Sequence, residues 1–247
     1  MHPQERVQLV LSLIRRGLND CEVSRTTGIP RSTVREWRIG RVRRPELRAA
    51  GCFICRREQP MLPSRSYAYL LGQYLGDGFI ARTKKGVFVL RVFSFSGYPN
   101  IVAECAGAMS RVMPASKVSV IPVPGVRLMI VSSSSKHWPC LFPQHGPGRK
   151  HERRIRLDAW QQSIVEHHPE AFLRGLVHSD GCRYMNRVKH YEYPSYGFAN
   201  MSGDISRLFS NACDQLAIKW RRSSAKNLAI TRRDSVAEMD TFIGPKG

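Results

Sequence analysis

Two acidic residues, each followed by glycine, end two similar segments of this sequence. Asp77 lies near the end of residues 70–78, and Asp180 lies near the end of residues 173–181. Both segments are mostly apolar helical runs with small residues four positions apart, namely Gly72 and Gly76 in the first and Gly175 and Ser179 in the second. Residues at i and i+4 share a helix face, and small residues there let two helices approach closely. Helices packed through this face would place Asp77 and Asp180 side by side.

Such a pair of carboxylates has a definite chemistry. A carboxylate at a helix C-terminus opposes the helix dipole, and two neighbouring carboxylates repel each other. A divalent cation with oxygen ligands relieves both problems, and metal ions between carboxylates and phosphates can hydrolyse phosphodiesters. The alternative for either copy is a helix with a glycine C-cap, since Gly78 and Gly181 suit a left-handed helix end. The repetition favours the paired site.

The elements that must position these acids recur in the same order. In the first copy we expect a strand at 86–95, a helix at 98–112, strands at 117–123 and 126–132, and a short segment at 136–142. In the second copy we expect a strand at 193–202, a helix at 205–218, strands at 219–224 and 227–231, and a short helix at 235–242. This parallel order indicates a tandem duplication.

These motifs resemble the LAGLIDADG homing-endonuclease family in its single-chain form with two motifs, over roughly residues 64–243. The final acid of each motif matches at Asp77 and Asp180, whereas Leu75 and His178 stand where the family has a first acid. The resemblance implies an α+β fold, a tandem αββαββ unit repeated about a pseudo-twofold axis. Its two sheets would form a saddle that binds double-stranded DNA.

The resemblance also implies a catalytic centre that hydrolyses DNA with Mg²⁺ or Mn²⁺. Asp77 and Asp180 would hold the metal, with Gly76 and Ser179 beside them. The family places basic residues near each centre to organise water. The candidates by position are Lys136 in the first copy and Arg232 or Arg233 in the second.

Charge points to a polyanionic partner. The formal net charge is +20, and both the N-terminal and the remaining regions are basic. Nucleic acid is the simplest such partner, and binding should weaken steeply with salt. The alternatives are solubility or the composition of a GC-rich bacterial genome. A glycine- and proline-containing linker between the copies offers phosphate contacts at Arg149, Lys150, Arg153, Arg154 and Arg156, unless it is merely a solvated basic segment.

Residues 4–39 are expected to form three short helices, with a turn at 28–30 and with Val34 and Trp37 facing inward. This pattern resembles the helix-turn-helix of homeodomain-like DNA-binding domains, whose last helix enters the major groove. The candidate DNA contacts are Arg31, Ser32, Thr33, Arg35, Glu36, Arg38 and Arg41. The alternative is a small helical bundle without a DNA role.

Cys52 and Cys55 form a lone Cys-x-x-Cys pair. A structural zinc ion needs four ligands, and no second pair with suitable spacing follows. We therefore expect no zinc ion here, and no thioredoxin-like context for redox chemistry surrounds the pair.

The expected organisation is a helix-turn-helix domain at 1–40, a linker at 41–63, repeat 1 at 64–144, a basic linker at 145–160 and repeat 2 at 161–247. No signal peptide or apolar stretch long enough to span a membrane is visible, and the seven cysteines form no disulfide framework. We expect a cytoplasmic monomer, because the duplication already supplies both halves of a pseudo-dimer.

Two functions compete. The first is a site-specific DNA endonuclease, favoured because both acids remain. The second is a catalytically silent DNA-binding transcriptional regulator on the same scaffold, favoured by the additional helix-turn-helix. An RNA-processing factor ranks last. This order rests on the resemblance, because a site with two acids and a basic saddle does not by itself separate DNA from RNA.

Overall fold

The computed structural model describes residues 4–40 and 62–244, and the chain divides into two compact units, Met1–Arg56 and Arg57–Gly247. The predicted contact Arg41, the Cys52/Cys55 pair and most of the predicted 41–63 linker lie outside the described residues.

The N-terminal unit contains three helices, α1 (Gln4–Arg15), α2 (Asp20–Thr27) and α3 (Arg31–Arg38), as the sequence predicted. The Asn19 side chain caps α2 by accepting hydrogen bonds from the backbone N–H groups of residues 21 and 22, and Gly28 ends α2 with φ 67°. Val34 and Trp37 of α3 face inward, where they pack with Val10, Leu13, Val23 and Ile29.

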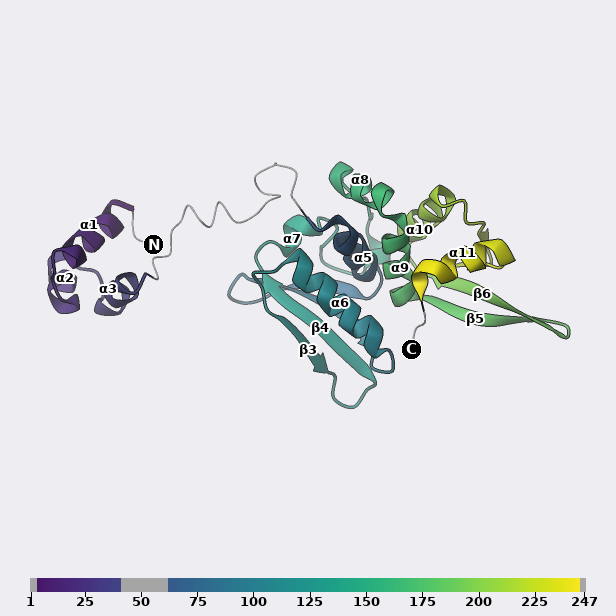
Figure 1. The fold of residues 1–247 in the computed structure, drawn as a ribbon, viewed down its shortest axis with the longest axis horizontal. Coiled ribbons are helices and arrows are strands. Elements are labelled where there is room, and N and C mark those ends of the chain that lie inside the picture. The colour runs from purple at the N-terminus through teal and green to yellow at the C-terminus, as the bar shows by residue number, and fades with distance from the viewer. Residues whose placement is uncertain (1–3, 41–61, 245–247) are drawn as a thin grey trace. The chain divides into compact units, whose positions relative to one another are not determined.

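The larger unit contains two copies of one arrangement (Figure 1). Repeat 1 consists of α5 (Ser64–Leu75), β1 (Gly78–Arg82), β2 (Phe88–Phe95), α6 (Pro99–Val112), β3 (Val118–Pro122), β4 (Leu128–Ser135) and α7 (Trp138–Leu141). The connection contains η1 (Lys150–Glu152) and α8 (Ala159–His167). Repeat 2 consists of α9 (Pro169–Asp180), β5 (Gly181–Val188), β6 (Tyr191–Ala199), α10 (Gly203–Gln215), β7 (Arg221–Arg222), β8 (Asn227–Ile230) and α11 (Arg233–Ile243).

Element by element, the residue patterns predicted most of this order but missed the strand that directly follows each acid. β1 is only five residues long, and β5 mixes charged, aromatic and small residues without regular alternation. Both strands are held by antiparallel pairing with the next strand, which local patterns do not reveal. The αββαββ order implied by the family resemblance is the one observed.

Each repeat forms a four-stranded antiparallel sheet, in the orders β1-β2-β4-β3 and β5-β6-β8-β7. In the first sheet, Leu90, Val92 and Val131 are buried on the face covered by helices. In the second, Phe198 stacks on Phe209 of α10 with ring centroids 4.3 Å apart. Within the described part of the chain, no helix covers the opposite face of either sheet, which is called the open face below (Figure 1). Among the described residues, no helix is long and apolar enough to cross a membrane.

Candidate paired-acid site

The helices α5 and α9 pack backbone against backbone at the centre of the larger unit (Figure 1). A Cβ atom added at Gly72 would lie 2.5 Å from the carbonyl oxygen of Phe172, and one added at Gly175 would lie 2.2 Å from that of Tyr69. These distances are shorter than any side chain tolerates. The structure therefore confirms that the small residues predicted in each motif form the contact between the two helices.

The prediction that Gly78 and Gly181 adopt left-handed helix ends is wrong. Neither residue is among the glycines with positive φ, and Gly181 is extended with φ −103° and ψ 168°. Each glycine begins a strand that turns back against the preceding helix. A Cβ atom would lie 2.6 Å from the Cα atom of Tyr74 in one copy and 2.7 Å from that of Val177 in the other. Glycine is required here for close approach, not for backbone conformation.

The packing brings the two acid-bearing helix ends together. A Cβ atom at Gly76 would lie 2.1 Å from Ser179 Oγ and 3.0 Å from Asp180 Oδ2, so the Asp180 carboxylate lies against the chain just before Asp77. Asp77 is exposed and Asp180 is half-buried. Asp180 Oδ2 accepts a hydrogen bond of 2.6 Å from Asn200 Nδ2, a partner that the sequence analysis missed. Asn200 follows β6, and only the sheet register places it beside Asp180.

Lys150 of the inter-repeat connection reaches the same place. Its Nζ atom donates hydrogen bonds to the carbonyl oxygens of Tyr74 at 2.5 Å, Leu75 at 3.0 Å and Gly76 at 2.6 Å, which are the last carbonyls of α5. Burial lowers the pKa of Lys150 to about 8, while the negative charges of Asp180 and Asp77 act in the opposite direction. Both acids are therefore close enough to stabilise this ammonium group.

A pocket of about 300 Å³ opens at the site. Its lining residues are Leu75, Gly76, Lys150, His151, Asp180, Ala199, Asn200, Met201 and Ile205. A second pocket of about 250 Å³ runs from Asp180 onto the open face of the second sheet. The acids thus lie where the open faces of the sheets meet the ends of the central helices.

The oxygen atoms that could serve as metal ligands at this site do not fit a divalent metal ion well. The Gly76 carbonyl is already bonded to Lys150, and Asp180 Oδ2 is already bonded to Asn200. The hydroxyl of Ser179 donates to the carbonyl oxygens of Gly175 and Leu176 within α9. Within residues 4–40 and 62–244, no group of three His, Cys, Asp or Glu residues could hold a metal ion. A buried ammonium group beside the two carboxylates also repels any second cation.

The other predicted basic residues lie elsewhere. Lys136 is exposed directly after β4. Arg232 directly precedes α11 and forms an ion pair with Asp234 at 2.7 Å. Both residues were predicted only from their positions near the ends of strands. Their catalytic role stays a prediction.

The basic linker is less solvated than its composition suggested. Arg153 donates from Nη1 to the carbonyl oxygens of residues 146, 147 and 148, and so holds the glycine-rich loop together. Lys150 is bonded as described above. Arg149, Arg154 and Arg156 are exposed, which leaves them as the linker residues able to contact phosphates.

In the N-terminal unit, Arg31, Ser32 and Arg35 are exposed on α3, and Thr33 is half-buried. Arg38 is used internally. Its guanidinium group donates to Asp20 Oδ1 at 2.7 Å and to the Leu18 carbonyl oxygen at 2.6 Å, and so ties α3 to the start of α2.

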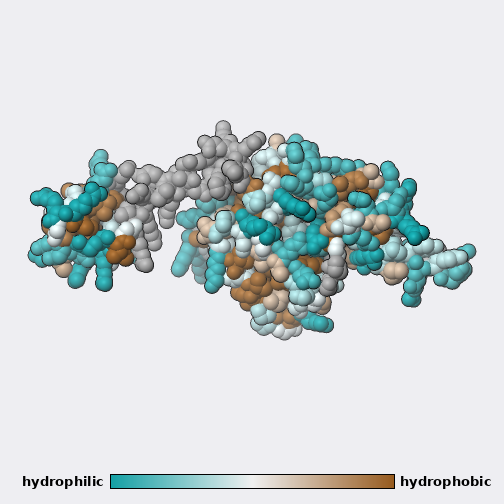
Figure 2. Space-filling model, viewed as in Figure 1, coloured by the Kyte–Doolittle hydropathy of each residue, from teal (hydrophilic) through white to brown (hydrophobic). Residues whose placement is uncertain are grey.

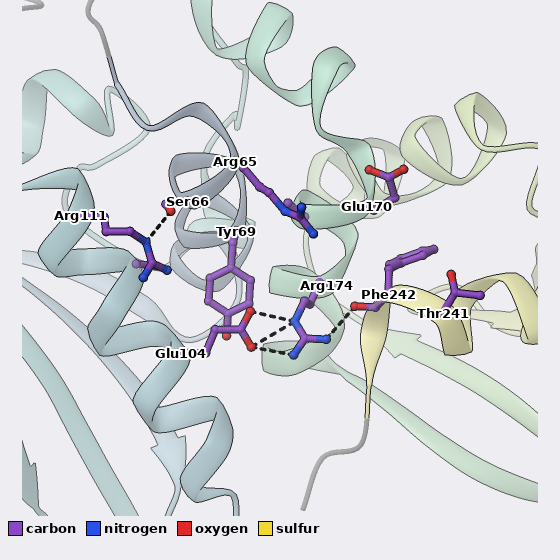
Figure 3. Close-up of a pocket in the computed structure, with 11 residues that line it drawn as sticks. Arg65, Ser66, Tyr69, Glu104, Arg111, Glu170, Arg174, Thr241 and Phe242 are labelled. Atoms are coloured by element: carbon purple, nitrogen blue, oxygen red, sulfur yellow. Dashed lines mark hydrogen bonds and ion pairs between the residues drawn. The ribbon is translucent and has the colours of Figure 1, made fainter.

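A pocket of about 330 Å³ lies at the other end of the central helices, between α5, α6, α9 and α11. Figure 3 shows the Arg174 guanidinium group against the Glu104 carboxylate, joined at 2.7 to 3.0 Å. Arg174 also donates to the carbonyl oxygens of Phe242 and Ile243 at the end of α11. Because Arg174 ties Glu104 of α6 to the end of α11, these contacts form a structural joint beside the pocket.

His178 belongs to this joint and points away from the acids. Its Nε2 lies 3.0 Å from the carbonyl oxygen of Ile243, and its Nδ1 lies 3.1 Å from the Tyr69 hydroxyl. A carbonyl oxygen can only accept, so Nε2 carries a proton and donates to the Ile243 carbonyl oxygen. Burial raises the pKa of Tyr69, which keeps this hydroxyl protonated. His178 therefore has a packing role where the family has its first acid.

The open faces of the sheets carry arginine and aromatic side chains. On the first sheet, Arg91 lies over the ring of Phe79 at 5.7 Å, and Arg127 lies over the ring of Phe95 at 5.1 Å. On the second sheet, Tyr184 and Tyr193 are exposed on the face opposite the buried Phe198. Both faces thus combine flat rings with polar or cationic groups.

No family model matches the sequence, and no curated protein matches it. Solved structures do match. Two variants of the homing endonuclease I-DmoI, each in complex with its target DNA, align with a TM-score of 0.50 at 17% and 16% identity, covering 74% of this chain and 95% and 97% of theirs. The N-terminal LAGLIDADG domain of DUF199/WhiA aligns with a TM-score of 0.46 at 13% identity, covering 74% of this chain and 83% of that domain. Residues 62–244 therefore have the LAGLIDADG fold of tandem αββαββ repeats.

Proposed function

We propose that this protein binds a specific site on double-stranded DNA through the open faces of its two sheets. The observation that carries the proposal is the composition of those faces. Arg91 and Arg127 lie over aromatic rings on the first sheet, and exposed tyrosines lie on the second, in a chain of net charge +20. Arginine suits both phosphate and guanine, and aromatic groups suit sugar and base edges. The I-DmoI structures of the same fold were determined with DNA.

Selection from a randomised duplex library, followed by fluorescence anisotropy, tests this proposal. We expect one preferred sequence, with affinity that falls steeply as salt increases. The double variant Arg91→Gln/Arg127→Gln should bind more weakly and show a smaller salt dependence. Arg207→Gln is the control for each single variant, Arg91→Gln and Arg127→Gln, because each removes one charge and Arg207 is exposed on α10, which covers the opposite face of the second sheet. Equal loss in the single variants and in this control would mean that only the overall charge matters.

The N-terminal unit is proposed to read an additional part of the site through α3. Arg31 and Arg35 are exposed there, and Arg35 lies one turn further along the same helix. Arg35→Ala should relax the base preference at one position, by about 1–3 kcal/mol for a lost base contact. Arg15→Ala is the control, since Arg15 is also exposed but lies at the end of α1. Unchanged base preferences in Arg35→Ala would remove this role.

Cleavage of the bound DNA is the second candidate function. It is favoured by one observation, the convergence of Asp77 and Asp180 at adjacent helix ends. Its test is incubation of a randomised plasmid library with Mg²⁺ or Mn²⁺, beside an Asp77→Asn/Asp180→Asn variant. Specific double-strand breaks lost in that variant would establish an endonuclease. Specific binding without breaks would instead support a DNA-binding regulator. The poor fit of a divalent metal ion to the oxygen atoms around Asp77 and Asp180 favours this second outcome.

A further inference from the structure

The ammonium group of Lys150 lies where the negative charges of the paired-acid site converge. It donates hydrogen bonds to three carbonyl oxygens at the end of α5, at 2.5, 3.0 and 2.6 Å. The end of a helix carries a partial negative charge, and its last carbonyl groups have no partner within the helix. Asp77 and Asp180 add two full negative charges nearby. A cation bound by this site would be drawn to this same position.

The hydrogen-bond count shows that Lys150 is committed to this position. An ammonium group has three N–H donors, and three carbonyl oxygens of α5 accept from it. The group also lies 5.1 Å from the centre of the Tyr74 ring, which favours a cation over its face. No donor is left for a DNA phosphate. Lys150 thus differs from Arg149, which is exposed on the same loop.

We propose that Lys150 is the resident cation of this site and takes the place that a divalent metal ion would occupy between the two acids. The chain is then able to bind DNA without a metal ion. Magnesium prefers a complete octahedral set of oxygen ligands, which a site shared with a lysine cannot supply. The metal-independent DNA binding rests on the proposed function. The position of Lys150 does not, because it is defined by contacts within the protein.

The experiment measures Mn²⁺ binding to the full chain by electron paramagnetic resonance, which reports the free ion. We expect the wild-type protein to show no saturable site at micromolar Mn²⁺. Lys150→Met keeps a similar length and apolar stem but removes the charge. We expect it to gain a site that binds Mn²⁺ at least tenfold more tightly, and this site should be lost again in Lys150→Met/Asp180→Asn. Lys84→Met, at an exposed position between β1 and β2, should behave as wild type.

A saturable micromolar Mn²⁺ site in the wild-type protein would overturn the proposal, and this result needs no variant to fold. Wild-type affinity for Mn²⁺ in a folded Lys150→Met would overturn it as well. In parallel, anisotropy with the selected duplex is measured in EDTA and in Mg²⁺ at equal ionic strength, and equal affinities are expected. Failure to bind any duplex would refute the proposed function, whereas the Mn²⁺ titration would still report on Lys150.

Discussion

The two repeats share one order of elements but differ in how their sheets are completed. In repeat 1, β4 pairs with β2 along eight residues, from the 88–135 pair to the 95–128 pair. In repeat 2, β8 pairs with only four residues of β6, Tyr196–Ala199, and β7 is two residues long. The outer part of the β5–β6 hairpin therefore extends beyond its sheet as a two-stranded ribbon (Figure 1). The duplication preserved the order of elements and not their lengths.

Their surfaces differ as well. Figure 2 shows apolar colour gathered over the β3–β4 end of repeat 1, where Val120, Ile121, Val126 and Leu128 are exposed. The projecting ribbon of repeat 2 is mainly hydrophilic in the same view. The two repeats thus differ in surface chemistry as well as in the lengths of their strands.

The central helices also differ away from their contact. Leu71 and Leu75 of α5 are fully buried, whereas the matching residues of α9 are Arg174 and His178. These two polar residues bond the last carbonyl groups of α11. The glycines at the helix contact are retained in both copies, because any side chain there would collide with backbone. The comparison teaches that close packing constrains a duplicated motif more strongly than its remaining faces do.

The largest expected effect tests this packing. Glycine to alanine normally stabilises the interior of a helix by about 1 kcal/mol. Gly72→Ala and Gly175→Ala should instead destabilise the protein by about 3 kcal/mol each, the upper end for overpacking, because the new methyl group meets backbone atoms. Chemical denaturation measures the difference. Gly203→Ala is the control, since nothing lies within 4 Å of its added Cβ. Equal stability of all three variants would show that the helices separate easily.

A second substitution makes repeat 2 resemble repeat 1. Arg174→Leu copies Leu71 and removes the hydrogen bonds to Glu104 and to the end of α11. We expect a loss of about 2–3 kcal/mol, because hydrogen bonds to charged groups are strong and the Glu104 carboxylate loses its partner. Arg207→Gln is the matched control, since its pair with Asp204 is exposed and long at 3.9 Å. It should change unfolding by less than about 1 kcal/mol.

Hydrogen exchange compares the two hairpins directly. Amide groups in the projecting ribbon, residues 184–195, should exchange at least about tenfold faster than those in the centre of β2. The reason is that an unsupported two-stranded ribbon is marginally stable. Mass spectrometry of peptides from residues 184–195 and 88–95 measures this ratio. Similar protection of both segments would indicate that the ribbon is covered, for example by DNA or by another molecule.

The smallest effect concerns the base of the ribbon. Asp240 of α11 accepts hydrogen bonds from Arg183 at 2.8 Å and from the Tyr196 hydroxyl at 2.6 Å. The Arg183 hydrogen bond, with help from Tyr196, lowers the pKa of Asp240. Its stabilising contribution is therefore present above the unfolded pKa of about 3.9 and is lost as the pH falls through the folded pKa.

Asp240→Asn should accordingly flatten the acid dependence of stability, by at most about 1 kcal/mol because the pair is largely exposed. Urea unfolding at pH 6 and pH 3 measures this difference. The free energy of unfolding of the variant should be lower than that of the wild type at pH 6, and the difference should shrink at pH 3. A constant difference at both values would assign the effect to packing.

Much of the fold followed from local patterns. The stripe of Ile101, Val102, Cys105, Met109 and Val112 predicted α6, and each of these residues is buried. The alternation in residues 86–95 predicted β2, with Leu90, Val92 and Ser94 buried on one face. The strands β1 and β5 were missed, because their residues lack alternation and gain stability only from pairing. The glycines after the acids were assigned the wrong role, since the crowding at those corners arises from the chain turning back on its own helix.

The sequence by itself determined the duplication, the contact face of the central helices and the excess of positive charge, because periodicity and composition are local properties. Only the tertiary structure decided what surrounds the acids. Lys150 lies more than seventy positions from the α5 carbonyl groups that it bonds, and Asn200 lies twenty positions from Asp180. Such partners are selected by helix packing and sheet register, which bring distant residues together without leaving a pattern in the chain.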